Sequence, residues 1–277
     1  MRHKKGKCLS GIGFLAEYMG KAVRKAGLPW KGETWGEKIF SAIVGILLLV
    51  AALHLGRTAA VYLQIGDADR QNASGGKVVV TEGRKCVVID AGHGGDDPGK
   101  VGINGALEKD INLEIANLVK QYLEASDVTV IMTRETDEGL YDPSAPNKKV
   151  QDMKRRIALI EEYSPLVTVS IHQNSYPEEY VHGGQVFYYN NSVQGQKLAE
   201  HIQKELVEKA DPENRRQVKA NDSYYLLKKT GSVIVIVECG FLSNSAEAEK
   251  LCTPEYQDRV AWAIHMGILQ YLNKNEK

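Results

Sequence analysis

The sequence has no excess charge of either sign and no pair of closely spaced cysteines. Its 277 residues include 35 basic and 35 acidic side chains, so the chain lacks the basic surplus that is typical of nucleic-acid-binding proteins. Four cysteines occur without any Cys-x-x-Cys spacing: Cys8, Cys86, Cys239 and Cys252. This distribution argues against a thiolate zinc site. Cys86 and Cys239 flank predicted strands, and we interpret them as buried apolar side chains.

The sequence also lacks an internal repeat and the common phosphate-binding patterns. Its glycine-rich stretch at 87–102 reads VVIDAGHGGDDPGKVG. It contains neither Gly-x-Gly-x-x-Gly nor Gly-Lys-Ser/Thr, and Asp96 and Asp97 would repel an anion. The apolar start predicts a buried strand, and the glycines allow tight backbone close to a ligand. His93 therefore lies where a strand opens into a loop, which favours a metal-binding or acid–base histidine over a plain loop histidine.

Three further polar residues stand at the ends of apolar runs. Glu108 begins a helical pattern, whereas His172 and Glu238 each end a strand-like run. If these strands are neighbours in one sheet, the three side chains converge with His93 at its edge. Two histidines and one glutamate would fill three positions around a zinc ion and leave the fourth for water. The second glutamate would then transfer protons.

Each of these residues also has a structural interpretation. Glu108 could complement the dipole of its helix, His172 could be a hydrogen-bonded core residue, and Glu238 could form a salt bridge. Asn174 and Ser175 make the strand end after His172 polar, which favours a site. A carboxylate such as Glu238, at the end of a strand buried on both faces, needs a cation or hydrogen bonds to compensate its charge.

The spacing of apolar residues predicts an α/β domain. It indicates helices at 108–125, 148–163, 192–208 and 254–272, and strands at 78–80, 87–89, 127–134, 166–171, 185–189 and 233–237. Residues 136–147 and 210–223 lack periodicity and are predicted to be loops. We expect a mixed, largely parallel six-stranded sheet with helices on both faces. Arg155 and Arg156 are interpreted as part of the solvated face of their helix.

The N-terminal part of the chain differs from the rest. Residues 1–38 hold nine Lys and Arg against three Glu. The apolar run at 39–55 is at the short end of the range for a transmembrane helix, and apolar character resumes after Arg57. The positive-inside rule places the basic segment in the cytoplasm. We predict an uncleaved anchor at 39–63, a linker at 64–84 and an extracytoplasmic catalytic domain at 85–273. A cleaved signal peptide and a buried core helix are the alternatives.

Four motifs carry a resemblance to a known family: DAGHGG at 90–95, EKD at 108–110, SIHQNS at 170–175 and VECGFLSN at 237–244. With these motifs in this order, residues 86–271 resemble the zinc-dependent N-acetylmuramoyl-L-alanine amidases of the type-3 family. The resemblance implies that His93, Glu108 and His172 bind zinc. It also implies that Glu238 is the catalytic carboxylate.

The family pattern is not matched everywhere. Relatives often carry Ala-Asn shortly after the arginine that corresponds to Arg156, whereas this chain reads Ile160-Glu161. The departure touches none of the four site positions.

The resemblance implies a function, namely hydrolysis of the amide that joins N-acetylmuramic acid to L-alanine in peptidoglycan. Residue chemistry alone indicates only metal-assisted amide hydrolysis. The alternatives are a zinc peptidase or deacetylase acting on another wall bond, and an inactive, membrane-tethered wall-binding protein. The short, anchored layout without a wall-binding module resembles amidases that prepare the spore cortex. The expected partners are peptidoglycan, the membrane and an activating protein of unknown identity, but not nucleic acid.

Overall fold

The computed structural model describes residues 86–274. The predicted basic segment, anchor and linker, and the predicted strand at 78–80, lie outside the described residues. Within them the elements are β1 (Cys86–Ala91), α3 (Glu108–Glu124), β2 (Thr129–Met132), α4 (Lys148–Tyr163), β3 (Val167–Asn174), β4 (Gln185–Tyr189), α5 (Val193–Glu205), the π-helix η1 (Leu206–Ala210), β5 (Lys219–Asn221), α6 (Tyr225–Lys229), β6 (Ile234–Phe241), α7 (Ser245–Leu251) and α8 (Pro254–Lys274). None of the helices between residues 86 and 274 combines the length and apolar character needed to cross a membrane.

The strands form one six-stranded sheet in the order β2-β1-β3-β6-β4-β5. All neighbouring strands are parallel except β4 and β6, which are antiparallel. The prediction of a mixed, largely parallel six-stranded sheet is therefore confirmed. The prediction of a continuous loop at 210–223 is wrong, because β5 lies within it. Three largely exposed residues at a sheet edge show neither a buried run nor an alternation that sequence could reveal.

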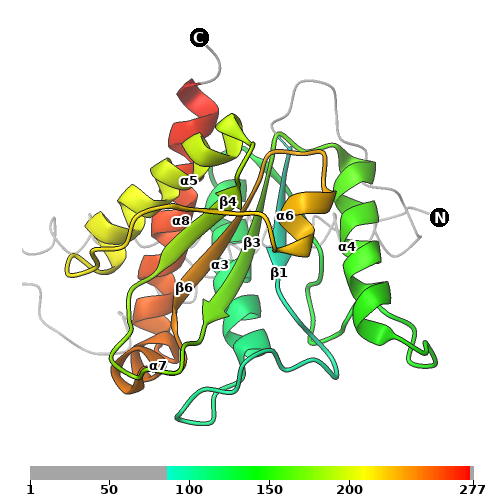
Figure 1. The fold of residues 1–277 in the computed structure, drawn as a ribbon. Helices are drawn as coiled ribbons and strands as arrows, with labels where there is room; N and C mark the ends of the chain where they lie inside the picture. Colours follow the sequence, from blue (N-terminus) through cyan, green and yellow to red (C-terminus); the bar gives the residue numbers. More distant parts are fainter. Residues whose placement is uncertain (1–85, 275–277) are drawn as a thin grey trace, which may run out of the picture. The chain divides into compact units, whose positions relative to one another are not determined.

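Helices cover both faces of the sheet, as predicted (Figure 1). On one face, α3, α5 and α8 pack against side chains such as Val87 and Ile89 of β1. On the other face, α4 and α6 pack against the alternate residues of the same strands, such as Val88 and Ile236. The sheet therefore separates two hydrophobic layers, and both layers are closed by helices.

The central strand β6 is buried along its whole length. Its β-branched run predicts this position, because a strand covered on both faces needs no polar alternation. Val235, Val237 and Cys239 face the layer of α3, α5 and α8, whereas Ile234 and Ile236 face the layer of α4 and α6. By this alternation Glu238 points to the α4 and α6 side.

Arg156 of α4 is buried at the base of this second layer, with 2% of its surface exposed. Its Nη1 donates to Asp90 Oδ1 at 2.6 Å, and its Nε donates to Asp152 Oδ2 at 2.6 Å. Thr133 and Ser170 also donate to the Asp90 carboxylate. The interpretation of Arg156 as a solvated side chain is therefore wrong. The helix turns this cation toward a strand whose carboxylate compensates it.

We expect Arg156→Met to cost about 3–5 kcal/mol of unfolding free energy at pH 7, because it leaves Asp90 as an uncompensated buried charge. Burial raises the pKa of Asp90, but Arg156 and the Ser170 hydroxyl hold it at about 2, below the ordinary 3.8. In the wild type, the ionised Asp90 carboxylate therefore contributes to the free energy of unfolding above pH 3.8, and this contribution is lost as the pH falls through about 2. The measurement is urea unfolding of both proteins as a function of pH.

The control is Arg155→Met, which alters an exposed position on the same helix and should change stability by no more than about 0.5 kcal/mol. The difference in unfolding free energy between wild type and Arg156→Met should become smaller as the pH is lowered, because Asp90 then becomes neutral. Equal stability of wild type and Arg156→Met at pH 7 would show that Arg156 does not compensate the buried charge of Asp90.

Candidate active site

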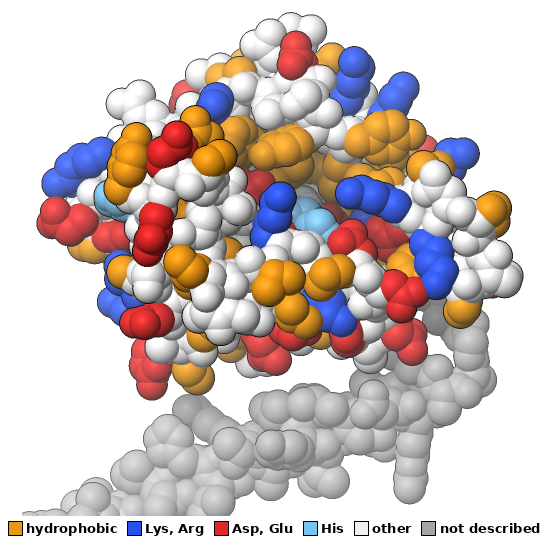
Figure 2. All heavy atoms as spheres, turned by 60° about the horizontal axis from the view of Figure 1, so that its bottom comes forward, with side chains coloured by type: hydrophobic (Ala, Val, Ile, Leu, Met, Phe, Trp, Pro, Cys, Tyr) orange, Lys and Arg blue, Asp and Glu red, His pale blue; other side chains and the backbone are white. Residues whose placement is uncertain are grey.

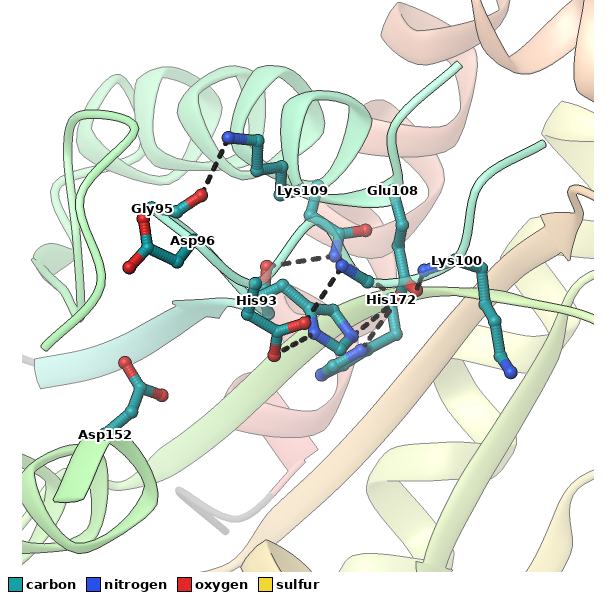
Figure 3. Close-up of polar contacts among 12 residues, drawn as sticks. His93, Gly95, Asp96, Lys100, Glu108, Lys109, Asp152 and His172 are labelled. Carbon is teal, nitrogen blue, oxygen red and sulfur yellow. Dashed lines mark hydrogen bonds and ion pairs between the residues drawn. The ribbon is translucent and has the colours of Figure 1, made fainter. Parts of the chain in front are cut away.

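Three of the four predicted site residues meet at the carboxyl end of the parallel strands. His93 follows β1, Glu108 opens α3, and His172 lies near the end of β3. His93 Nε2 lies 3.2 Å and His172 Nδ1 lies 3.0 Å from the same atom, Glu108 Oε1 (Figure 3). Taking one ligand atom from each residue, all three atoms lie within 4.8 Å of one another. The side chains could therefore hold a single metal ion.

Glu238 stands directly beside this cluster. It pairs with His172 in the register of β3 and β6, and 7% of its surface is exposed. Its Oε1 accepts a hydrogen bond from the Tyr224 hydroxyl at 3.3 Å, whereas Oε2 has no partner among residues 86–274. No Lys or Arg of the described residues pairs with it, so the salt-bridge interpretation finds no support there. Burial raises the pKa of Glu238.

The charge of Glu108 is compensated from several sides. Burial would raise its pKa, but hydrogen bonds to His172 and His93 hold the pKa well below its usual range. The backbone N–H groups of Lys100 and Gln173 also donate to the carboxylate, at 2.7 and 3.0 Å. For His172, burial acts to lower the pKa, but the hydrogen bond to Glu108 raises it overall. The carboxylate therefore stays ionised inside the protein.

Asp97 fixes the ring of His93. Its Oδ2 lies 2.8 Å from His93 Nδ1, and its Oδ1 accepts the Gly99 N–H at 3.1 Å. This contact leaves Nε2 of the ring directed at Glu108, and such carboxylate–histidine pairs commonly orient metal ligands. The sequence pattern indicates Asp97 only as a residue that repels anions. Its position four residues after His93, in a tight loop, is the signal that could have revealed the contact.

Two glycines give the cluster its space. A Cβ on Gly92 would lie 2.2 Å from His172 Cε1, and a Cβ on Gly99 would lie 2.6 Å from Glu108 Oε2. Gly99 also has a φ of 67°. His93 itself adopts a φ of 63°, which is uncommon for a residue with a side chain. The loop after β1 is therefore shaped around the neighbouring ligand side chains.

Two buried arginines hold this loop by its carbonyl oxygens. Arg134 donates from Nε to Ala91 O at 2.9 Å and from Nη2 to Gly92 O at 3.0 Å. Arg156 donates from Nη2 to His93 O at 2.6 Å. Three consecutive carbonyls are thus bound by guanidinium groups, which offsets the cost of the left-handed conformation at His93. No spacing in the sequence marked Arg134, because its partners are backbone atoms.

His93 and His172 of the cluster line a cavity of about 360 Å³, together with Glu238. Tyr141 from the 136–147 loop and Tyr224 also line it. Figure 2 shows histidine at the bottom of a hollow, with basic and hydrophobic side chains around the rim. The loop predicted at 136–147 therefore contributes to the lining of this cavity.

The other histidines that the structure describes do not join the cluster. His201 Nδ1 lies 3.3 Å from Gln270 Oε1, and His265 Nε2 lies 3.0 Å from Ser126 Oγ. The free thiols of Cys86 and Cys239 are buried, as predicted.

Comparison with known proteins identifies this arrangement. The profile of the N-acetylmuramoyl-L-alanine amidase family matches residues 87–270. The chain belongs to this family. It is 39% identical over 194 residues to the germination-specific N-acetylmuramoyl-L-alanine amidase of Bacillus subtilis, an alignment covering 69% of this chain and 81% of that protein. The resemblance seen in the four motifs is thereby confirmed.

Solved amidases share the fold. The CwlD amidase of Clostridioides difficile, solved in complex with the GerS lipoprotein, superimposes with a TM-score of 0.67 at 38% identity, over 69% of this chain and 100% of that one. The amidase AmiC2 of Nostoc punctiforme gives a TM-score of 0.60 at 32% identity, over 69% of this chain and 98% of that one. Both similarities cover the α/β domain that carries the cluster.

We expect Gly92→Ala to lower the affinity for divalent metal at least ~10-fold, because the new methyl group must displace the His172 ring from Glu108. The control is Gly231→Ala, since a Cβ there meets no atom within 4 Å. Metal content after dialysis, measured by plasma mass spectrometry, checks the prediction. Equal metal content in both variants would show that Gly92 does not set the position of His172.

Proposed function

We propose that this chain is a zinc-dependent amidase that cleaves the bond between N-acetylmuramic acid and L-alanine in peptidoglycan. The observation that carries the proposal is the convergence of His93, Glu108 and His172 beside Glu238, within a chain of this amidase family. In this proposal the first three residues hold the metal, and Glu238 is the catalytic carboxylate.

The donor set fits zinc. Two imidazoles and one carboxylate form a set that catalytic zinc sites use. The nitrogen–oxygen separations of 3.2 and 3.0 Å are close to the edge of a tetrahedron with zinc–ligand bonds of about 2.0–2.1 Å. When bound, zinc supplies a Lewis acid that activates water and polarises the amide carbonyl. The Asp97 carboxylate supports metal binding by His93, because it holds the ring with Nε2 directed toward Glu108.

Glu238 provides the acid–base chemistry. Its Oε2 is free of protein partners among residues 86–274, so this atom can receive the proton of the attacking water. The protonated carboxyl group then delivers that proton to the leaving amide nitrogen. Burial raises the pKa of Glu238, which brings it closer to the value that suits a general base near neutral pH.

The biological setting forms a second part of the proposal. The apolar segment at 39–63 would anchor the chain in the cell membrane, with residues 1–38 in the cytoplasm and the domain at 85–273 on the wall side. Peptidoglycan as substrate supports this orientation. The similarity to the germination-specific amidase of Bacillus subtilis supports a role in the spore cortex. The lipoprotein complex of the Clostridioides difficile amidase supports a protein partner.

Glu238→Gln should retain its zinc and lower the release of amines from purified peptidoglycan by at least ~10²-fold, because the amide cannot take up the water's proton. The measurement combines metal analysis with identification of the new N-terminal amino acid. Wild type should expose only L-alanine amines, and chelation should abolish this activity until zinc is restored. Wild-type turnover in Glu238→Gln would show that Glu238 is not the general base. Amines of another residue or of glucosamine would indicate a peptidase or a deacetylase.

The full chain should sediment with membranes, whereas a chain that starts at residue 66 should stay in the supernatant, because only the former carries the 39–63 segment. Cell fractionation followed by immunoblotting checks this. The control is N-terminal sequencing, which should show that the sedimented protein keeps its original N-terminus. A soluble full chain, or a new N-terminus after residue 50, would contradict an uncleaved anchor.

A further inference from the structure

The two oxygens of the Glu238 carboxylate are in different situations. Oε1 accepts a hydrogen bond from the Tyr224 hydroxyl at 3.3 Å, and this is the one side-chain partner of Glu238 among residues 86–274. Oε2 is buried and has no hydrogen-bond partner in the same part of the chain. The hydroxyl of Tyr224 therefore distinguishes the two oxygens.

Tyr224 is held firmly where it makes this contact. Its backbone N–H donates to Asn221 Oδ1 at 2.8 Å, and its carbonyl oxygen accepts from the Lys228 N–H at 3.2 Å, in the first turn of α6. Its ring packs edge-on against Phe187 of β4, with 5.5 Å between the ring centroids and an interplanar angle of 77°. The hydroxyl is therefore presented to the cavity by a side chain with little freedom to move.

The chemical state of Tyr224 is that of a neutral donor. Burial raises its pKa, and the negative charge of Glu238 raises it further. A phenol in this state neither accepts the proton of water nor attacks a carbonyl, but it donates a hydrogen bond to a carboxylate.

We propose that Tyr224 is a positioning residue for the amidase reaction, which fixes the Glu238 carboxylate through Oε1 and leaves Oε2 to accept the proton. The inference rests on the proposed function, in which Glu238 is the base. A carboxylate can rotate about its terminal carbon–carbon bond, and partial rotation would move Oε2 from its present position. The hydrogen bond from Tyr224 to Oε1 opposes this rotation.

The test is Tyr224→Phe in the full chain, assayed on purified peptidoglycan. Phenylalanine keeps the ring that packs on Phe187 and removes only the hydroxyl. We expect kcat to fall ~10- to 100-fold, which corresponds to the loss of one hydrogen bond to a charged group. The KM should stay within about twofold, and zinc content and Tm should match the wild type. The matched control is Tyr180→Phe, at an exposed tyrosine (78%) outside the cavity, which should behave as wild type.

A double-mutant cycle separates positioning from other roles. Glu238→Asp withdraws the carboxylate by about one carbon–carbon bond, ~1.5 Å, which places it beyond reach of the hydroxyl. Adding Tyr224→Phe to Glu238→Asp should therefore lower kcat by less than about twofold. This outcome, together with the loss in the single variant, supports the proposal.

Four results would overturn the positioning role. Wild-type kcat in Tyr224→Phe would show that the hydroxyl is dispensable. The same loss in both the wild-type and the Glu238→Asp backgrounds, or a loss accompanied by lower zinc content or Tm, would show a structural or substrate-binding role instead. Full activity of Glu238→Gln would overturn this proposal and the proposed base together, whereas an inactive Glu238→Gln beside an unimpaired Tyr224→Phe would overturn the positioning role alone.

Discussion

One buried carboxylate determines how the active site is assembled. Glu108 is 2% exposed, and a charge at that depth must be compensated. The compensation comes from two imidazoles that approach the same oxygen atom. These imidazoles belong to segments 15 and 64 residues away in the chain, so the requirement to satisfy Glu108 draws the loop after β1, the start of α3 and the end of β3 together. A cation at this point would satisfy the same requirement.

A second layer of polar contacts supports the first. Asp90 and Thr133 accept hydrogen bonds from the guanidinium of Arg156, and Ser170 donates to the same Asp90 carboxylate. That guanidinium also holds the carbonyl oxygen of His93. The stability of α4 on the sheet and the backbone conformation of a proposed metal ligand therefore depend on the same side chain. Folding and site geometry are coupled here through direct contacts, without any need for a long-range pathway.

The sequence allowed prediction of the four central residues, but not of the side chains that support them. His93, His172 and Glu238 end or follow apolar runs, and parallel strands bring such ends to one edge, so their position follows from local pattern and sheet geometry. Arg134 and Arg156 act through partners that no local pattern reveals, whereas the partner of Asp97, His93, lies only four residues before it. Arg156 reads as a solvated helix residue because its partner Asp90 is 66 residues away. β5 escaped prediction for a related reason, since a three-residue edge strand is defined only by its neighbour.

The alternation along β6 has a chemical consequence. Glu238 faces the cavity, and the next residue, Cys239, faces the opposite layer, where burial raises the pKa of its thiol. An insertion or deletion of a single residue in β6 would exchange these two faces. The cleft would then present sulfur in place of carboxylate, and the acid would be forced into hydrocarbon. The chemistry of this enzyme thus depends on which alternate residues of β6 face the cleft, as well as on the identity of those residues.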